Sequence, residues 1–541
     1  MEMADAGPQG DDAKRQGLLS LNDLTYLLEP DLSVATNVTH KNHFFQGTEY
    51  TQNQRAVCII NSGADYIDTR TSYLKFKAEL TVSSPIPAGG GGARVYFGQQ
   101  GSAVNLIKNI TVTSRSGDEI CRITDVNRLQ NMISAYRYDT EWADTVGQAM
   151  GYNSFLSTRN TSAVGDVYSS SVTTGYQHTF CIPLYCLTDF FGYGRLMPSM
   201  IMSGLRIEIE FEDLSLVGVA TGHQVSSGND ARFGAARVTD QAVAQAVGTG
   251  GGTYDEDVTK LNGYKIIDPV LTLKSVQLTD ATQRALNELS ATNGLELVYT
   301  DFERTETVYP APTNKAHVEI RKACSRALSA IARVRVDKSH LIAGDGSSTL
   351  SLSYKDSQVD SFASEPSSSI IDYQWQLGSL YFPQQPIKGN VEEVAMDGYL
   401  HTVDAFGKLG DTQKHLHCKL AQSGSLGSHS VTKDLIEWVS GLPSSHCYKN
   451  QAGNRVGGGL NFIYDPVPQN YIPGTFRSYG QTWAVSLERS SMFELAGVPI
   501  NNSRVLALRM QFDSSKKRTI DVYLKYVKLA RLFLNNVEIE Q

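Results

Sequence analysis

The octapeptide LRIEIEFE, Leu205 to Glu212, decides the fold because its side chains alternate without error between apolar and charged. Such alternation is typical of a β-strand with one buried face. Near the C-terminus, IDVYLKY (Ile520 to Tyr526) repeats the pattern, with apolar residues at every even position. We expect these two segments to be the closing strands of two separate sheets, so that the chain completes one β-domain and then builds another.

The length and composition of the chain also suit two β-domains. It has 541 residues, of which 41% are hydrophobic, and it contains 46 glycines. One β-sandwich reaches at most roughly 200–250 residues, so this chain is too long for a single core. We predict an all-β protein with two tandem eight-stranded antiparallel jelly-roll barrels and short helical insertions.

Changes in composition divide the chain into four parts. Residues 1–50 form a predicted N-terminal arm, in which GLLSLNDLTYLLEP (Gly17 to Pro30) has the cap, apolar stripe and proline stop of a short amphipathic helix. Because so short a helix is marginal in water, we expect it to dock on its own domain or on a neighbouring subunit. Residues 51–215 are the predicted first jelly roll, 216–262 a Gly/Ala/Ser-rich linker or loop, and 263–541 the second jelly roll.

The charge of the chain argues against a generic nucleic-acid-binding protein. The net charge is −8, whereas affinity for phosphate comes mainly from clustered Lys and Arg. In the first fifty residues eight acidic side chains oppose three basic ones. We therefore expect no sequence-specific binding of nucleic acid and no neutralisation of a genome by the arm.

Export and membrane insertion are not indicated either. The N-terminus lacks a cationic segment followed by an apolar one, so no signal peptide is predicted. The least polar stretch, Phe180 to Met202, is interrupted by prolines and charges, so no transmembrane segment is predicted. Seven scattered cysteines, an odd number, favour reduced thiols inside a cell over a disulfide framework.

Motifs for catalysis or metal binding are weak. HLHC (His415 to Cys418), with His429, His446 and Cys447 downstream, contains metal-ligand residue types, but zinc sites use tighter paired spacings. We interpret these as ordinary loop residues and expect no metal. The nucleotide-binding motif G-x-x-x-x-G-K-[ST] and the hydrolase motifs G-x-S-x-G and H-E-x-x-H do not occur. We therefore expect no catalytic residue, no cofactor and no enzyme.

An aromatic run raises a different possibility. Tyr373, Trp375, Tyr381 and Phe382 would suit a sugar-binding platform of the kind found in β-sandwich lectins. The spacing of two between Tyr373 and Trp375 favours the alternative, in which both fill the core from one face of a strand.

Two segments resemble a known family. IPLYCLTDFFGYGRLMPSMIMSGLRIEIEFE (Ile182 to Glu212) resembles the end of the first barrel in major capsid proteins of the double jelly-roll lineage. YQWQLGSLYFPQQPI (Tyr373 to Ile387) resembles part of the second barrel in capsid proteins of polinton-like viruses, adintoviruses and virophages. The resemblance covers about residues 40–541 in layout, and it rests on order, spacing and length rather than on a short motif.

This resemblance implies a major capsid protein of a double-stranded DNA virus. Its homotrimers would form pseudo-hexagonal capsomers that tile an icosahedral shell, with penton and minor capsid or cement proteins as further partners. The protein would be made inside the host cell and located in the virion. We expect subunit contacts in the arm helix and in the two family-like segments, at Leu21, Leu24, Leu28, Arg195, Pro198, Phe382 and Pro383.

Two alternatives stay open. One is a non-catalytic carbohydrate-binding protein with two β-sandwiches, such as a spike or fibre component. The other is a coat protein of a single-stranded RNA virus, against which the acidic arm speaks, because such proteins usually carry basic arms.

Overall fold

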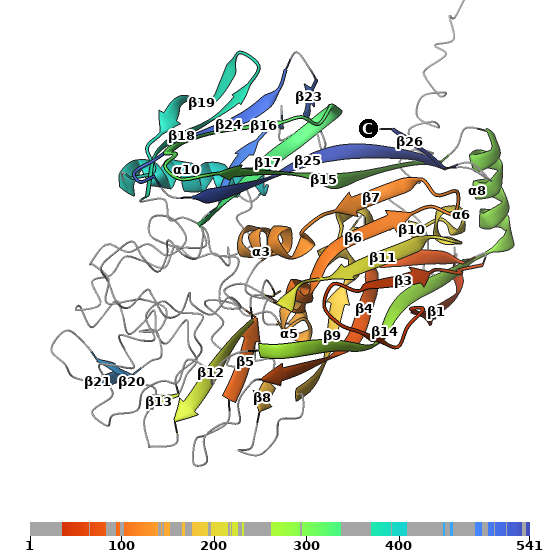
Figure 1. Cartoon of the computed structure of the whole chain (residues 1–541). Helices are drawn as coiled ribbons and strands as arrows, with labels where there is room; N and C mark the ends of the chain where they lie inside the picture. The colour runs from red at the N-terminus through yellow and green to blue at the C-terminus, as the bar shows by residue number, and fades with distance from the viewer. Residues whose placement is uncertain are drawn as a thin grey trace, which may run out of the picture.

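Two β-sandwiches lie next to each other in the computed structural model, and helix α8 (Asp280–Thr292) connects them (Figure 1). Strands dominate both, which confirms the predicted all-β class. The structure describes residues 35–63, 65–82, 93–97, 102–138, 142, 145–151, 165–167, 176–192, 196–214, 217, 219–225, 230–231, 261–292, 295–336, 369–390, 392–407, 447–449, 455–457, 482–488, 496–501, 504–515, 517–532 and 537–540.

The first barrel consists of two antiparallel sheets that enclose one core. One sheet has the order β1 (Ala35–Phe44), β14 (Leu261–Leu278), β4 (Tyr66–Val82) and β10 (Leu196–Met197), with β2 (Glu49–Tyr50) on β14 and β9 (Tyr176–Pro183) on β4. The other sheet has the order β3 (Arg55–Ile59), β11 (Arg206–Phe211), β6 (Ile107–Thr113) and β7 (Glu119–Ile123).

The second barrel has the same construction. One sheet has the order β15 (Leu295–Tyr309), β25 (Arg518–Leu532), β17 (Cys324–Val336) and β22 (Trp483–Ser486), with β26 (Val537–Glu540) on β25 and β23 (Val498–Ile500) on β17. The facing sheet has the order β16 (Lys315–Ile320), β24 (Leu506–Phe512), β18 (Ile370–Leu377) and β19 (Leu380–Ile387).

Eight strands of one barrel correspond in order to eight strands of the other. If β1, β3, β4, β6, β7, β9, β11 and β14 are counted in chain order, the sheets read 1-8-3-6 and 2-7-4-5, and the strands β15 to β19, β22, β24 and β25 give the same two orders. The fifth strand of each barrel is followed by a helix, α3 (Val126–Tyr136) after β7 and α10 (Glu392–Ala405) after β19. This repeated order is that of a jelly roll.

Strand pairing places the boundary between the barrels later than residue 262. β14 lies in the stretch predicted as second jelly roll, but it pairs with β1 and β4 as the eighth strand of the first barrel. The stretch predicted as a linker is therefore an insertion between β11 and β14. β1 likewise belongs to the first barrel although it lies in the predicted arm, and the predicted helix at 17–30 lies outside the described residues.

Part of the insertion forms an additional small sheet. Its order is β13 (Asp230–Ala231), β12 (Val219–Val225), β5 (Ala93–Phe97) and β8 (Gly165–Val167). The remaining described elements are the helical segments η1 (Ala103–Leu106), α5 (Val146–Ala149), η3 (Leu184–Cys186), η4 (Asp189–Gly192) and α6 (Ser199–Met202), and the paired strands β20 (Cys447–Lys449) and β21 (Arg455–Gly457).

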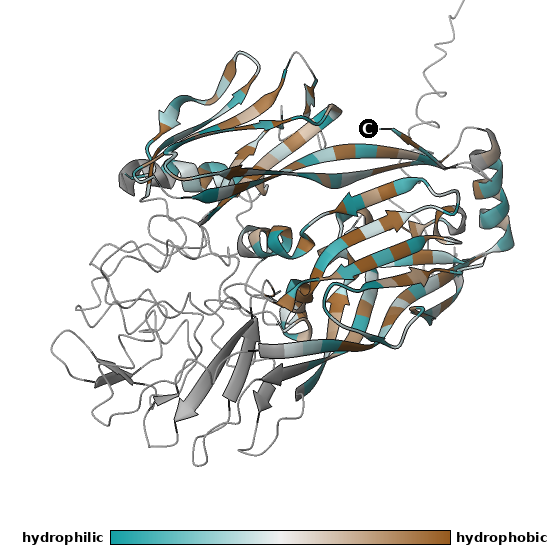
Figure 2. Cartoon of the chain, viewed as in Figure 1, coloured by the Kyte–Doolittle hydropathy of each residue, from teal (hydrophilic) through white to brown (hydrophobic). Residues whose placement is uncertain are grey.

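LRIEIEFE and IDVYLKY belong to β11 and β25, and each of these strands lies inside its sheet rather than at an edge. β11 lies between β3 and β6, and its Ile207, Ile209 and Phe211 are buried as the alternation predicts. Figure 2 shows the same alternation of apolar and polar residues along most strands of both barrels. β25 lies between β15 and β17, and β26 follows it in the chain.

The apolar residues change from even to odd positions at Tyr526–Val527, which predicts a β-bulge in this strand, but the bulge lies in the strand opposite. β25 pairs with β15 in unbroken register from Arg518 to Leu532, and the irregularity lies opposite, in β17 between Ala327 and Ser329. Apolar residues change phase in β25 because both of its faces are buried.

Trp375 lies at the centre of the second core, where it is buried with Tyr373 and Trp483. We expect Trp375→Ala to lower the free energy of unfolding of this barrel by about 3–5 kcal/mol, because the change removes apolar contacts and leaves a cavity. Val308→Ala, at an exposed position of β15 in the same barrel, is the control and should change it by less than about 0.5 kcal/mol. Denaturant titration followed by circular dichroism measures both, and an equal effect of the two changes would contradict the assignment of Trp375 to the core.

Candidate functional site at the interface between the barrels

The second barrel rests on the first through the outer face of β15 and β25 (Figure 1). Val522 and Leu524 point into the second core, whereas Tyr523 between them belongs to the core cluster of the first barrel. Phe302 of β15 belongs to the same cluster, and the ring of Tyr299 meets that of Phe190 edge to face at 5.1 Å. Side chains of both barrels therefore pack in one continuous apolar cluster, which joins the barrels.

Two side chains of the second barrel complete the edge of the first. β7 is an edge strand of its sheet and lies beside β15. The carbonyl oxygen of Ile120 in β7 accepts hydrogen bonds from Tyr299 Oη at 2.7 Å and from Lys528 Nζ at 3.1 Å. These donors take the place of a strand partner, so this edge is protected against pairing with another chain.

Lys528 and Asp301 form a fully enclosed ion pair beside this contact. Lys528 Nζ lies 2.6 Å from Asp301 Oδ2, and both side chains are 2% exposed. The backbone N–H of Phe302 donates to Asp301 Oδ1 at 2.9 Å. Burial raises the pKa of the Asp301 carboxyl, and the attraction of Lys528 opposes that shift without cancelling it. Separating such a pair would leave each charge buried without a partner, so the two side chains stay together.

A larger cluster of charges joins α3 to the second barrel. Asp125 contacts Arg128 next to it and Arg304 of β15, the latter at 2.9 Å. Arg304 also lies 2.6 Å from Asp521 of β25, whose other oxygen is 2.5 Å from Arg335. Acids and bases alternate through the cluster, so each buried charge has an opposite neighbour.

The backbone at Asp125 has a special conformation. Asp125 is the N-cap of α3 with φ at 50°, in the left-handed region where Asp is tolerated better than β-branched residues. Its carbonyl oxygen accepts a hydrogen bond from Tyr523 Oη at 3.1 Å. The start of α3 is thus bound to the second barrel through both backbone and side chain.

Asp189 makes a third polar contact between the barrels. Its carboxylate lies 3.0 Å from Arg137 of the first barrel and 3.3 Å from Lys525 of the second, and Thr300 Oγ1 donates to it at 2.7 Å. Burial alone would raise the pKa of this carboxyl, but Lys525 and Arg137 outweigh burial and hold the pKa below its ordinary value. Asp189 therefore stays ionised at neutral pH.

We expect Asp301→Ala to lower the free energy of unfolding by about 3–5 kcal/mol, because it leaves Lys528 charged and unpaired at a buried position. The double variant Asp301→Leu with Lys528→Met is the matched control, since it removes both charges and keeps the volume. It should recover stability to within about 1 kcal/mol of the natural protein. Denaturant titration of the three proteins tests this, and an equal loss in single and double variants would assign the effect to shape alone.

Asp189 predicts a loss of stability in acid. A carboxyl whose pKa is lower in the folded than in the unfolded state stabilises the fold above the unfolded pKa, and that contribution is lost as the pH falls through the folded pKa. We expect the natural protein to lose stability steeply from about pH 4 downward. Asp189→Asn should be less stable at pH 7 and lose less between pH 4 and 2. Thermal unfolding midpoints across pH measure this, and parallel curves for the two proteins would refute it.

The described residues do not assemble a reactive centre. Burial raises the pKa of the Cys58 and Cys186 thiols to about 12, so both stay protonated at neutral pH and are poor nucleophiles. In this part of the chain no group of three or more His, Cys, Asp or Glu side chains is placed to hold a metal ion. No helix within it is long and apolar enough to cross a membrane. His415, His417 and Cys418 lie outside the described residues.

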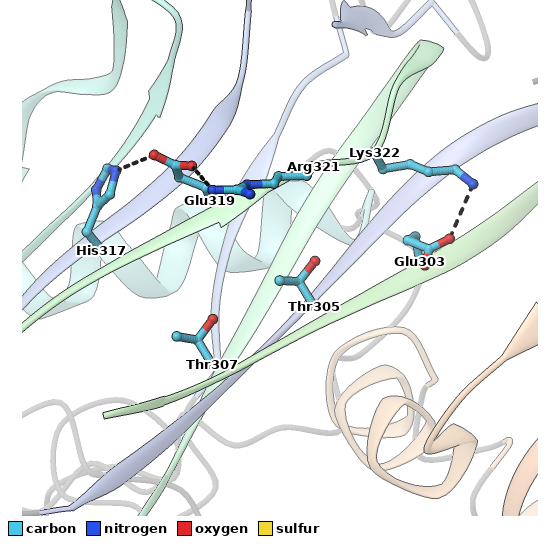
Figure 3. Close-up of a pocket in the computed structure, with 7 residues that line it drawn as sticks. All are labelled: Glu303, Thr305, Thr307, His317, Glu319, Arg321 and Lys322. Carbon is cyan, nitrogen blue, oxygen red and sulfur yellow. Dashed lines mark hydrogen bonds and ion pairs between the residues drawn. The ribbon is translucent and has the colours of Figure 1, made fainter. Parts of the chain in front are cut away.

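A surface pocket of about 520 Å³ lies between β15 and β16 of the second barrel (Figure 3). Glu319 lies 3.5 Å from His317 and 3.3 Å from Arg321, and Glu303 lies 3.3 Å from Lys322. The charged side chains of the pocket thus form ion pairs with one another, and the pocket lining contains no nucleophile next to a base. The lining residues are Glu303, Thr305, Thr307, His317, Glu319, Arg321 and Lys322.

The residues predicted for subunit contacts are not gathered at one place. Pro198 is half-buried in the first barrel, where its carbonyl accepts from Ile201 and Met202 at the start of α6. Phe382 and Pro383 are half-buried on β19 at the far edge of the second barrel, and Phe382 packs against the second core. Their role in subunit contact stays a prediction. Leu21, Leu24, Leu28 and Arg195 lie outside the described residues.

Sequence reasoning missed the charged interface between the barrels. The available signal was β25 itself, where Asp521, Lys525 and Lys528 interrupt a strand that is apolar on both faces. Charges in such a strand must be paired. Which acids and bases pair with them depends on residues hundreds of positions away, and no local pattern reports that.

Comparison with known proteins rests on the fold. No family model matches the sequence, and no curated protein matches it. Among solved structures, the PBCV-1 virus capsid matches with a TM-score of 0.50 at 10% identity, covering 96% of this chain and 99% of that one. A chain of the Sputnik virophage structure matches with a TM-score of 0.50 at 10% identity, covering 95% of this chain and 90% of that one.

The fold is the double jelly roll of viral capsid proteins. The mavirus major capsid protein also aligns, with a TM-score of 0.47 at 8% identity over 100% of this chain and 96% of that one. The match to the PBCV-1 capsid extends over nearly the full length of both chains, so both jelly rolls and their connection take part in the likeness.

Proposed function

We propose that this protein is the major capsid subunit of a double-stranded DNA virus, and that three copies associate into a pseudo-hexagonal capsomer. The observation that carries the proposal is the pair of jelly rolls with one strand order, fixed against each other by a buried interface. One chain is thus a rigid tile with two similar lobes. Three such tiles around a threefold axis present six barrels, the number that a hexagonal outline needs.

The chemistry of the chain supports a structural role rather than a catalytic one. The polar groups at the barrel interface are engaged in holding the barrels together, as Lys528 with Asp301 illustrates. The net charge of −8 suits a shell that receives DNA by packaging better than one that condenses a nucleic acid around itself. Penton proteins, cement proteins and neighbouring capsomers are the partners of the proposed capsomer, and its place is the virion.

A carbohydrate-binding function is less well supported. A sugar platform needs an exposed aromatic face, and Trp375 and Tyr373 are instead buried in the second core. Tyr373 and Trp375 therefore contribute packing, as their spacing of two predicts, whereas Tyr381 is exposed on β19.

We expect the purified chain to form a stable trimer with three times the 59.3 kDa mass of one copy. An obligate oligomer of this kind buries roughly 2,000 Å² or more at each contact, so the trimer should persist at nanomolar concentration. Mass photometry measures the species, and negative-stain electron microscopy should show hexagonal outlines. A monomer that persists at micromolar concentration in both methods would contradict the proposal.

A further inference from the structure

The contact between the two barrels of one chain has a counterpart that the described part of the chain covers only partly, since α10 packs on α3 through Tyr399 and Phe406 but leaves its other side exposed. In the strand order that the barrels share, β15 and β25 of the second barrel correspond to β1 and β14 of the first. β7 and α3 of the first barrel correspond to β19 and α10 of the second. The outer face of β15 and β25 meets β7 and α3, so the counterpart contact would join β1 and β14 to β19 and α10.

The elements that meet within the chain, α3 and the outer face of β15 and β25, are buried where they are in contact. In α3 every residue from Val126 to Ser134 is buried. On the outer face that covers it, Phe302 and Tyr523 are buried as well. The second barrel contributes to this burial, because Arg304 and Tyr523 contact Asp125 and Tyr136 packs on Tyr399 and Phe406 of α10.

The counterpart elements β1, β19 and α10 instead expose large apolar side chains. On β1, Val38 is 50% and Phe44 71% exposed. They share the outer face of the sheet, because Phe44 pairs with Val270, the neighbour of the core residue Leu271. Leu380, at the start of β19, is 56% exposed, and Leu400 of α10 is 44% exposed.

α10 is a firmly held platform for such a contact. Thr402 Oγ1 donates to the carbonyl of Thr482 at 3.2 Å, which ties the helix to the strand region of β22. Gly398 allows the close approach of α10 to β18, because a Cβ there would collide with the hydroxyl of Tyr373. Among the residues of α10 from 397 onward, where exposure is described, the helix exposes Asp397, Leu400, His401 and Asp404.

Opposite charges meet between the barrels, and charges of opposite sign also lie on the two uncovered surfaces. Between the barrels, the cations Arg304 and Lys525 of the sheet face meet the acids Asp125 and Asp189 of the first barrel. At the uncovered surfaces, the outer face of β1 and β14 carries the exposed His40 and Lys274, and Lys274 also contacts Asp68. The exposed side of α10 carries two acids.

We propose that a second copy of this chain covers α10 and β19 with the outer face of its β1 and β14, repeating between copies the contact that joins the barrels within one copy. This inference rests on the proposed function and names the surfaces through which the copies meet. The contact is head-to-tail, since different surfaces of each copy take part, and three repeats close a ring. Phe44 and Leu400 are its apolar centres.

Single charges introduced at either surface test the contact. Phe44→Glu and Leu400→Glu should each raise the concentration of half-assembly by about thirtyfold or more in mass photometry, because a carboxylate replaces an apolar anchor. Ile59→Glu is the matched control. Ile59 is an apolar residue on β3 of the same barrel as Phe44, and it is 54% exposed. β3 corresponds to β16 of the second barrel, whose His317 and Glu319 stay exposed in the contact within the chain. We therefore expect Ile59 to lie outside the contact between copies. This control should assemble like the natural protein.

Mixing the two variants tests the pairing of the surfaces. The Phe44→Glu copy keeps an intact α10, and the Leu400→Glu copy keeps an intact β1, so the mixture should form heterodimers although each variant alone is monomeric. A circular dichroism spectrum like that of the natural protein and a single cooperative thermal transition confirm that the variants are folded, and a lower midpoint is expected where assembly is lost.

The outcomes separate the two proposals. A natural protein that is itself monomeric overturns the proposed function. A trimeric natural protein whose Phe44→Glu and Leu400→Glu variants assemble like Ile59→Glu overturns the surface assignment and leaves the capsomer intact. Folded monomeric variants that form no heterodimer on mixing overturn the pairing of β1 with α10, and pairing with another viral protein at these surfaces then becomes the explanation.

Discussion

The architecture depends on β25, a strand that is buried on both faces. One face fills the second core and the other lies on the first barrel, so each polar group along it needs a partner inside the protein. Asp521, Lys525 and Lys528 have such partners in Arg304, Asp189 and Asp301. Buried ion pairs add little net stability compared with apolar packing, but they tolerate only one arrangement. We infer that these pairs set the angle between the barrels, which a repeating shell needs to hold constant.

Much of the fold was predictable from local pattern. Alternation along β11 and the spacing of Tyr373 and Trp375 report burial directly, because side chains two apart in a strand share a face. The place of β14 was not predictable in this way. It follows a long insertion, and its membership of the first barrel depends on pairing with β1 and β4, which lie far away in the sequence.

The candidate site was less predictable than the fold for the same physical reason. Asp125 and Tyr523 are 398 positions apart, and their hydrogen bond exists only because two barrels meet there. The sequence marks β25 as apolar on both sides with a few charges, and that pattern also fits a strand with a bulge. Only the position of a second barrel distinguishes these interpretations. The predicted contact residues Phe382 and Pro383 lie on β19, an edge strand of its sheet.

The contact between the barrels of one chain and the proposed contact between copies differ in chemistry, because only the first joins parts of the same chain. Within the chain, the short link through α8 keeps the barrels at a high effective concentration, so the interface can include buried charges whose desolvation is costly. Between separate copies no such link exists, and association must itself supply the free energy. In the proposed contact between copies, burial of exposed apolar side chains such as Phe44 and Leu400 provides that free energy. The same geometry thus suits a permanent contact within the chain and, in the proposed capsomer, assembly between copies.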